Sequence, residues 1–368
     1  MLIFNALFQC RSPALLGVDI GSSGVKLVEL GRDRSGQFRL ERCALEPLGE
    51  GWVVDGQIEK FDEVAQAMRR AVRKSGARVR DAVLALPAAA VITRKIVLPD
   101  GLDGLSAQEL EAQVQAQARR HIPFPLDEVS MDFCVLGQRT LDAEPAGAVE
   151  ILMAASRKDK VQERQGLAEA AGLRARILDI ETFAARRAAT RLLAHWRGDG
   201  ADRPDALAAL FEIGAGVTRL QALRGEEWLY SRDQEGGGAQ LTQRIVHQYG
   251  LSAEEAEARK RRGDWPEDYA GRVLEPFVAH MAQEVARALQ FFYTSTPYDR
   301  VDVVLLAGGS AGLPGLAEAV ARQAGVACRL ADPFDGMAPP ADLSALPSRR
   351  EAPAYLRACG LAMRKFAP

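Results

Sequence analysis

Residues 16–30 read LGVDIGSSGVKLVEL, and this stretch decides the fold class of the chain. An apolar run that carries Asp19 leads into a turn of very small residues, and a second alternating run follows it, which is the pattern of a β-hairpin. Backbone N–H groups in such a turn converge on an anion, so a phosphate group suits it. The residues concerned are Gly21, Ser22, Ser23 and Gly24, with Lys26 near enough to lean over the turn. The alternative is a glycine-rich hairpin with a surface lysine.

The same pattern returns at residues 209–223, which read ALFEIGAGVTRLQAL. One hairpin in each domain-sized half predicts two lobes of common plan. Two such turns on facing lobes would hold a polyphosphate from both sides, with Asp19 and Glu212 directed at an intervening Mg²⁺, which prefers oxygen ligands. These two carboxylates are the candidate catalytic and metal-binding residues.

A third motif, LLAGGSAGLPGL, occupies residues 305–316. A buried strand runs into glycines and then into a helix with Pro314 in its first turn. The backbone can therefore approach a flat or ribosyl ligand closely, and the N-terminus of the new helix faces that ligand.

Composition excludes several classes of protein. The 368 residues include 47 basic and 49 acidic side chains, so the net charge of −2 gives no reason for the chain to coat nucleic acid or an anionic bilayer. The five cysteines are scattered without metal-ligand spacing, which predicts neither disulfides nor zinc and fits a reducing cytoplasm. The apolar runs are too short to span a membrane.

Strands and helices alternate along the chain, so the class is α/β. Helices are predicted over 61–75, over about 273–293 and over 354–366, and Ser106 with Glu109 forms a capping box that opens a polar helix. The sequence pattern changes between Pro87 and Gly172, which indicates an inserted subdomain. Residues 197–204 are the clearest linker.

With its three motifs in this order, the chain resembles the actin, hexokinase and heat-shock chaperone ATPase superfamily. Within that superfamily, residues 16–30 and the segment RRHIPFPLDEV at 119–129 resemble the PilM family, the cytoplasmic actin-like proteins of type IV pilus assembly, which are similar in turn to FtsA. The resemblance implies a two-lobed actin-like (ribonuclease H-like) ATPase fold with an FtsA-type subdomain inserted in the first lobe.

The domain boundaries that follow from this resemblance are expectations. The first lobe would comprise residues 1–87, continued by 173–200 and 351–368. Residues 88–172 would form the inserted peptide-binding subdomain. The second lobe would span 201–350 and include a smaller subdomain, about 237–298, that closes over the nucleotide.

The resemblance also implies a site for ATP and Mg²⁺. Besides the first turn, it implies phosphate contacts at Gly214, Ala215, Gly216 and Thr218, nucleoside contacts at Gly308, Gly309 and Ser310, and ribose and adenine contacts at Gly237, Gly238, Glu257 and Lys260. Glu257 and Lys260 are equally well explained as a solvated pair one helical turn apart. The second motif usually begins with aspartate, and the extra methylene of Glu212 moves its carboxylate by roughly a bond length, which disturbs octahedral metal geometry unless a bridging water absorbs the change. We therefore expect binding to survive better than hydrolysis, with at most a slow ATPase.

As a partner, the resemblance implies the short cytoplasmic tail of PilN, a membrane protein, held in a groove between the first lobe and the insert. The residues suited to this are Ile122, Pro123, Phe124 and Pro125, which form a stiff extended segment. Ordinary packing of Ile122 and Phe124 is the alternative. The protein would then lie in the cytoplasm at the inner membrane face, bound there through its partner, and would link pilus motor ATPases to the periplasmic machinery.

Two other functions are compatible with the superfamily. A small-molecule kinase would need a cleft carboxylate that accepts a substrate hydroxyl proton, and none stands out between the hairpins. An FtsA-like filament protein would need its own membrane affinity, and the last helix, with Arg357, Arg364 and Lys365, is amphipathic enough to raise that question. This helix is more simply explained as the closing helix that packs back on the first lobe.

Overall fold

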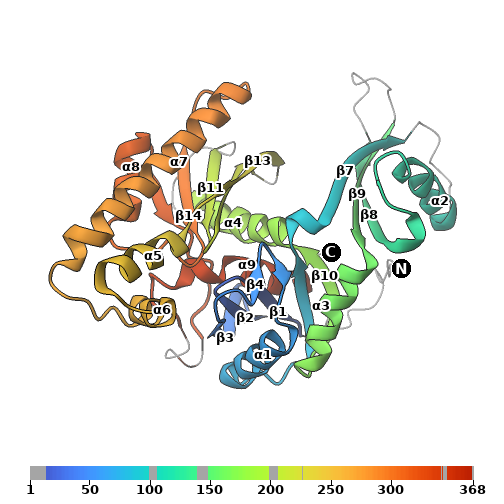
Figure 1. Cartoon of the computed structure of the whole chain (residues 1–368). Helices are drawn as coiled ribbons and strands as arrows, with labels where there is room; N and C mark the ends of the chain where they lie inside the picture. The colour runs from blue at the N-terminus through green and yellow to red at the C-terminus, as the bar shows by residue number, and fades with distance from the viewer. Residues whose placement is uncertain are drawn as a thin grey trace. The chain divides into compact units, whose positions relative to one another are not determined.

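The computed structural model describes residues 14–98, 106–138, 148–198, 206–225, 227–340, 342 and 346–366. The chain forms two compact units, one of residues Leu86–Leu167 and a larger one of Met1–Ala85 with Ala168–Pro368 (Figure 1). Each unit has hydrophobic clusters of its own. The division of the larger unit into the predicted lobes, with their boundaries, stays a prediction.

The first sheet of the larger unit has the strand order β10-β6-β1-β2-β3. Its strands are β1 (Leu16–Gly21), β2 (Gly24–Arg32), β3 (Phe38–Pro47), β6 (Asp81–Leu86) and β10 (Arg174–Ile180). Strands β1 and β2 are antiparallel and end on the pair Gly21 and Gly24, so the two serines form the predicted hairpin turn. Helix α1 (Phe61–Ser75) has the predicted bounds and buries its apolar side. The short strands β4 (Val53–Val54) and β5 (Gln57–Ile58) pair separately.

The second sheet has the order β13-β12-β11-β14-β15 and repeats the plan of the first. Its strands are β11 (Leu207–Ile213), β12 (Val217–Arg224), β13 (Glu227–Glu235), β14 (Val303–Ala307) and β15 (Cys328–Leu330). In both sheets a central strand has an antiparallel hairpin partner on one side and a parallel strand on the other. This is the duplication that the two hairpin motifs predict.

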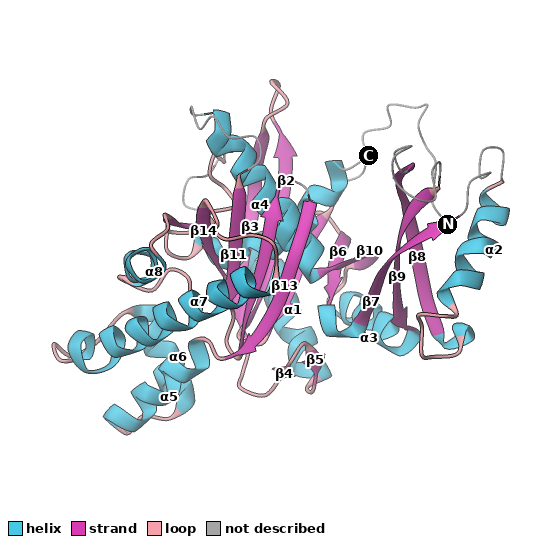
Figure 2. Ribbon diagram, turned by 90° about the horizontal axis from the view of Figure 1, so that it is seen from above, coloured by secondary structure: helices cyan, strands magenta, loops and turns pink. Residues whose placement is uncertain are grey.

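Every residue of β11 is buried. Because successive side chains point to opposite sides of a sheet, the strand is covered on both faces. Phe211 and Ile213 belong to a cluster with residues of α5 (Gly238–Tyr249), α7 (Glu275–Ser295) and α8 (Leu316–Ala324). Leu210 belongs to a second cluster with α4 (Glu181–Gly198) and α9 (Leu356–Ala362). Because that second cluster also contains residues of β2 and β3, α4 and α9 share one core with both sheets. Figure 2 shows α4 beside β2, β3 and β11.

Helices α4 and α9 approach one another very closely. A Cβ atom added to Gly360 of α9 would overlap the carbonyl oxygen of Ala184 in α4. On β1, a Cβ atom at Gly17 would overlap the carbonyl oxygen of Ala358. Glycine is therefore required at both positions by close backbone packing, which fixes where the first turns of α4 and α9 lie.

The smaller unit contains a three-stranded antiparallel sheet in the order β7-β9-β8. Its elements are β7 (Val91–Leu98), α2 (Ala107–Ala118), β8 (Val129–Gln138), β9 (Val149–Arg157) and the start of α3 (Lys158–Ala170). Ser106 and Glu109 form the predicted capping box of α2. The buried residues Val114 and Ala118 give this polar helix a narrow packing face.

Three predicted elements differ from the structure at their ends. The predicted final helix divides into 3₁₀ turns over Ala352–Tyr355 and Met363–Phe366 with α9 between them, because helix ends readily tighten to i→i+3 hydrogen bonds. The predicted linker is helical through Gly198, and residues 199–205 lie outside the described ranges. A π-helical turn, Ala270–Leu274, precedes α7.

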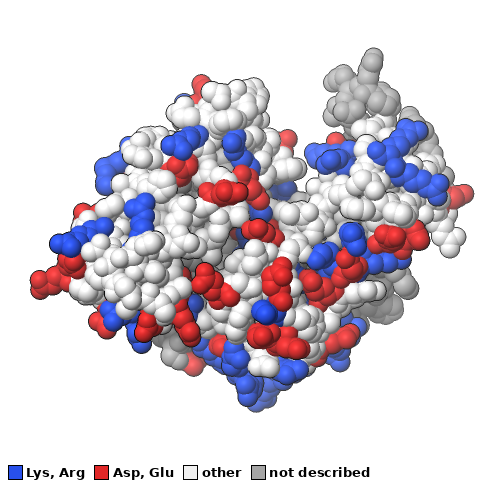
Figure 3. All heavy atoms as spheres, in the orientation of Figure 1, with Lys and Arg blue, Asp and Glu red and all other residues white. Residues whose placement is uncertain are grey.

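The surface carries no single-signed charge field on the face shown in Figure 3, where acidic and basic side chains alternate. This agrees with the near-zero net charge of the sequence. Within the described ranges, the helices all fall short of the length and apolar character that crossing a bilayer demands.

Candidate nucleotide site and its charge network

The first hairpin places Asp19 and Lys26 directly across from one another on β1 and β2. The Nζ atom of Lys26 lies 3.5 Å from the Asp19 Oδ2 atom, and both side chains are buried. A Cβ atom at Gly21 would come within 2.9 Å of the same Nζ atom. The ammonium group of Lys26 thus lies over the turn, where it would face a bound anion.

The second hairpin turn packs against the start of α5. The backbone N–H groups of Gly238 and Ala239 donate to the carbonyl oxygens of Gly214 and Ala215, each at 2.9 Å. Thr218 Oγ1 donates to the Gly236 carbonyl oxygen at 2.8 Å. A Cβ atom at Gly237 would lie 2.8 Å from the Ala215 oxygen, so only glycine fits there.

The third glycine motif packs against the second hairpin and the start of α5. Gly308 has a positive φ of 92°, and a side chain there would meet the backbone of Ile213. The Ser310 N–H donates to the Ile213 carbonyl oxygen at 3.3 Å, and the Ser310 hydroxyl fills the position that a Cβ atom on Gly238 would need. The structure therefore brings together three segments that the sequence separates: residues 214–218, 236–238 and 308–310.

Glu257 and Lys260 of α6 (Ala253–Arg262) lie beside this cluster. Lys260 Nζ donates to the Gly238 carbonyl oxygen at 3.0 Å, to Thr242 Oγ1 at 2.8 Å and to Glu257 Oε1 at 2.7 Å. Burial lowers the pKa of Lys260 despite the neighbouring Glu257 carboxylate. The side chains of Lys260 and Glu257 are 16% and 33% exposed, and their hydrogen bonds to Gly238 and Thr242 hold the first turn of α5.

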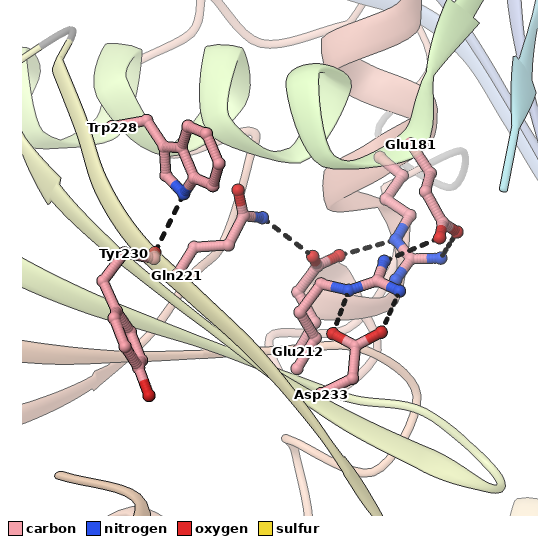
Figure 4. A network of polar contacts seen from close by, with 8 residues as sticks. Glu181, Glu212, Gln221, Trp228, Tyr230 and Asp233 are labelled. Atoms are coloured by element: carbon pink, nitrogen blue, oxygen red, sulfur yellow. Dashed lines mark hydrogen bonds and ion pairs between the residues drawn. The ribbon is translucent and has the colours of Figure 1, made fainter. Parts of the chain in front are cut away.

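A network of charged side chains lies at the second hairpin (Figure 4). Arg357 of α9 donates from Nε to Glu212 Oε1 and from Nη1 to Glu181 Oε2, both at 2.6 Å. The second oxygen of Glu212 accepts a hydrogen bond from Gln221 at 3.3 Å. Burial acts to lower the pKa of Arg357, but the carboxylates of Glu181, Glu212 and Asp19 outweigh it and raise the pKa.

Arg219 extends the network to β13. It donates from Nε and Nη2 to the two oxygens of Asp233, both at 2.6 Å, and from Nη1 to Glu181 at 2.7 Å. Here too the hydrogen bonds to Asp233 and the charge of Glu181 overcome burial and raise the pKa of the guanidinium. Glu181, the first residue of α4, is therefore shared by both guanidinium groups.

The glycine turns fit a phosphate-bearing ligand. Cβ atoms added to Gly216 or Gly309 would meet nothing within 4 Å, so the space next to both residues is open. The side-chain oxygen of Gln240, on the first turn of α5, is buried and has no hydrogen-bond partner among the residues that the structure describes. Open space beside small residues and an unpaired acceptor suit a ligand with hydroxyl groups.

The carboxylates fit a metal ion less well. Both oxygens of Glu212 accept hydrogen bonds, one of them from a guanidinium group. In the described ranges, groups of three or more His, Cys, Asp or Glu side chains suited to a metal ion are absent. The geometry does not favour direct ligation of Mg²⁺ by Glu212, and metal binding by Asp19 and Glu212 stays a prediction.

The residues predicted to bind a partner lie in two different environments. Ile122 is buried in a cluster of the smaller unit with Ala118, Val129, Met153 and Ala155. Phe124, between Pro123 and Pro125, is 39% exposed, and its ring lies 5.8 Å from the Arg157 guanidinium carbon. Ile122 therefore serves ordinary packing, whereas Phe124 presents an aromatic face to its surroundings.

Comparison with known proteins supplies the family. Residues 17–366 match the family described as type IV pilus assembly protein PilM. The chain belongs to the PilM family. It is similar to the solved PilM-PilN type IV pilus biogenesis complex, with a TM-score of 0.74 and 29% identity over 96% of this chain and 99% of that chain.

The PilM match and the duplicated sheets confirm the predicted actin-like α/β fold. The ethanolamine utilization protein EutJ from Carboxydothermus hydrogenoformans shares that fold, with a TM-score of 0.54 and 19% identity over 95% of this chain and 89% of that chain.

The sequence alone does not identify Arg357 as the centre of the charge network. The sequence places Arg357 on a last helix that either faces a membrane or packs back on the first lobe, and in the structure the residue pairs with Glu212 and Glu181. A charged residue inside the apolar run LRACGLAM was the available signal. Arg219 carried a second signal in the sequence, because it stands seven residues after Glu212, as Lys26 does after Asp19.

Proposed function

We propose that this PilM-family chain is a nucleotide-binding, actin-like scaffold that binds the cytoplasmic tail of a PilN protein. The observation that carries the proposal is the family match over nearly the whole chain, together with the similarity at 29% identity to a structure described as a PilM-PilN complex. This family membership favours a role in pilus assembly over a small-molecule kinase.

ATP is the nucleotide that the proposal assigns to the glycine cluster. The phosphates would be held by the turn residues Gly21–Gly24 with Lys26 and by Gly214–Gly216 with Thr218. Gly308–Ser310 and the α5 start at Gly237–Gly238 would hold the nucleoside, with Glu257 and Lys260 supporting α5. Contacts with the charged phosphates and the nucleoside of ATP would order these segments. Hydrolysis of ATP would be slow at most, because no strong general base lies among the candidate residues.

A substitution into open space tests this nucleotide site. Gly309→Val places a side chain where a Cβ atom meets nothing within 4 Å, so the fold should be kept while ATP binding is lost. Gly271→Ala, at another glycine with open surroundings, is the matched control and should bind like the parent. Equal ATP affinity of all three proteins in a calorimetric titration would count against the proposed site.

The PilN tail is proposed to bind the smaller unit through the segment that includes Phe124. An exposed aromatic ring beside proline-stiffened backbone suits an extended peptide, which gains affinity from side-chain contacts and backbone hydrogen bonds. Bound to a membrane-anchored partner in this way, the protein would lie in the cytoplasm at the inner membrane face and connect pilus motor ATPases to the periplasmic machinery.

Calorimetry with a synthetic PilN tail, with and without ATP and Mg²⁺, tests the partner. Phe124→Ala should weaken binding by about tenfold, since losing an anchoring aromatic contact costs more than about 1 kcal/mol. Phe61→Ala is the control, because Phe61 is also a phenylalanine with 39% exposure but belongs to α1. Absence of peptide binding in both buffers would remove the scaffold function.

A further inference from the structure

The acidic residues of the two hairpins have different ion-pair partners. In the first, Asp19 pairs with its cross-strand neighbour Lys26 at 3.5 Å. In the second, the cross-strand neighbour of Glu212 is Arg219, but this arginine is engaged by Asp233 and Glu181. Glu212 therefore takes its positive partner from another element of the fold.

That partner is Arg357, delivered by α9. Its side chain is 23% exposed and Glu212 is 4% exposed, so the 2.6 Å contact between them is poorly screened by water. The guanidinium bridges Glu212 and Glu181 and lies close enough to Asp19 to feel its charge. One fixed cation thus neutralises the acidic residue of the second hairpin, a role that the sequence assigns to Mg²⁺.

A metal ion would have to displace this guanidinium to reach Glu212. Both Glu212 oxygens already accept hydrogen bonds, from Arg357 and from Gln221. Moving Arg357 away would also remove one of the two guanidinium partners of Glu181, leaving its contact with Arg219. Mg²⁺ moreover demands near-ideal octahedral geometry and gives up its waters reluctantly.

We propose that Arg357 is the resident cation of the nucleotide site and that this chain binds ATP without a metal ion held by Glu212. The inference rests on the proposed nucleotide-binding function. It assigns the charge neutralisation at the second hairpin to a residue of the chain itself, so that the affinity for ATP is nearly independent of Mg²⁺.

The test is a calorimetric titration of the full chain with ATP, in buffer with Mg²⁺ and in buffer with EDTA. The dissociation constants of the parent protein should agree within about threefold. Arg357→Met frees the Glu212 carboxylate, and binding should then become at least tenfold tighter with Mg²⁺ than with EDTA. The double variant Arg357→Met with Glu212→Gln removes that carboxylate and should lose the Mg²⁺ dependence again.

Two further proteins keep the test decisive. Arg357→Lys retains a cation and should behave like the parent, which covers the case that Arg357→Met fails to fold. Arg39→Gln is the control, since it breaks an Arg–Glu contact of the same length, 2.6 Å to Glu41, on β3. It should leave both dissociation constants unchanged.

A second readout measures the metal directly. Electron paramagnetic resonance of Mn²⁺ with ATP should give the same protein-bound spectrum for the parent and for Glu212→Gln, and a different spectrum for Arg357→Met. Tenfold tighter ATP binding by the parent with Mg²⁺, or a protein-bound Mn²⁺ signal lost in Glu212→Gln, would overturn the inference and leave the nucleotide site standing. No ATP binding in either buffer would overturn both.

Discussion

Replacing Gly360 by alanine should destabilise the larger unit, although alanine is the better helix former. Propensity alone favours alanine by about 1 kcal/mol inside a helix. At this position, however, the new Cβ atom would lie 2.6 Å from the carbonyl carbon of Ala184 and would overlap its oxygen. Overpacking a core costs about 1–3 kcal/mol, and a clash with backbone places the cost at the upper end. We expect a net loss of about 2 kcal/mol.

Thermal unfolding measures this loss. For domains of this size about 1 kcal/mol lowers the melting temperature by roughly 2 °C, so a decrease of about 4 °C is expected for Gly360→Ala. Gly271→Ala is the matched control, because its Cβ atom meets nothing within 4 Å and its stability should stay the same or rise. If Gly360→Ala is as stable as Gly271→Ala, the close approach of α4 and α9 is wrong.

Three further results are expected. Arg219→Gln should lower the free energy of unfolding by about 1 kcal/mol in urea titrations, because it removes the bidentate partner of Asp233, which is 48% exposed, while Glu181 keeps Arg357; no measurable loss would contradict the network. The hydrogen bond from Arg174 lowers the pKa of Asp81, so its stabilising contribution is complete above the ordinary value of 3.8 and is lost as pH falls through the lowered pKa. The stability difference between the parent and Asp81→Asn should therefore shrink on acidification below 3.8, and a difference independent of pH would refute this. Burial raises the pKa of Cys359 to about 12, so a thiol reagent at pH 8 should label the exposed Cys134 in the native protein and Cys359 only after unfolding, as read by mass spectrometry of peptides.

The hairpins and their shared plan could be predicted because their signals are local. Alternating apolar residues around turns of glycine and serine specify two strands and their register, and Gly21 with Gly24 closes the first hairpin as expected. Helix α1 was equally predictable, since its whole apolar stripe lies within fifteen consecutive residues.

The charge network could not be predicted because its partners are far apart in the sequence. Arg357 and Glu212 are separated by 145 residues, and Arg357 and Glu181 by 176. Charge type and spacing name a partner only between neighbours on one element, such as Glu257 and Lys260. Which of several acidic residues receives a distant guanidinium depends on how α9 packs against α4, and that packing is set by the backbone contact at Gly360.

The dependence of this network on α9 bears on how the protein is made. A ribosome adds about 5–20 residues per second, so roughly twenty seconds to a minute pass between the appearance of Asp19 and that of Arg357. During this interval Glu181 and Glu212 lack the guanidinium that joins them in the finished protein, and both sheets lack part of their shared core. The nascent chain therefore exposes apolar surface until its last helix is made, which is when chaperones would bind it.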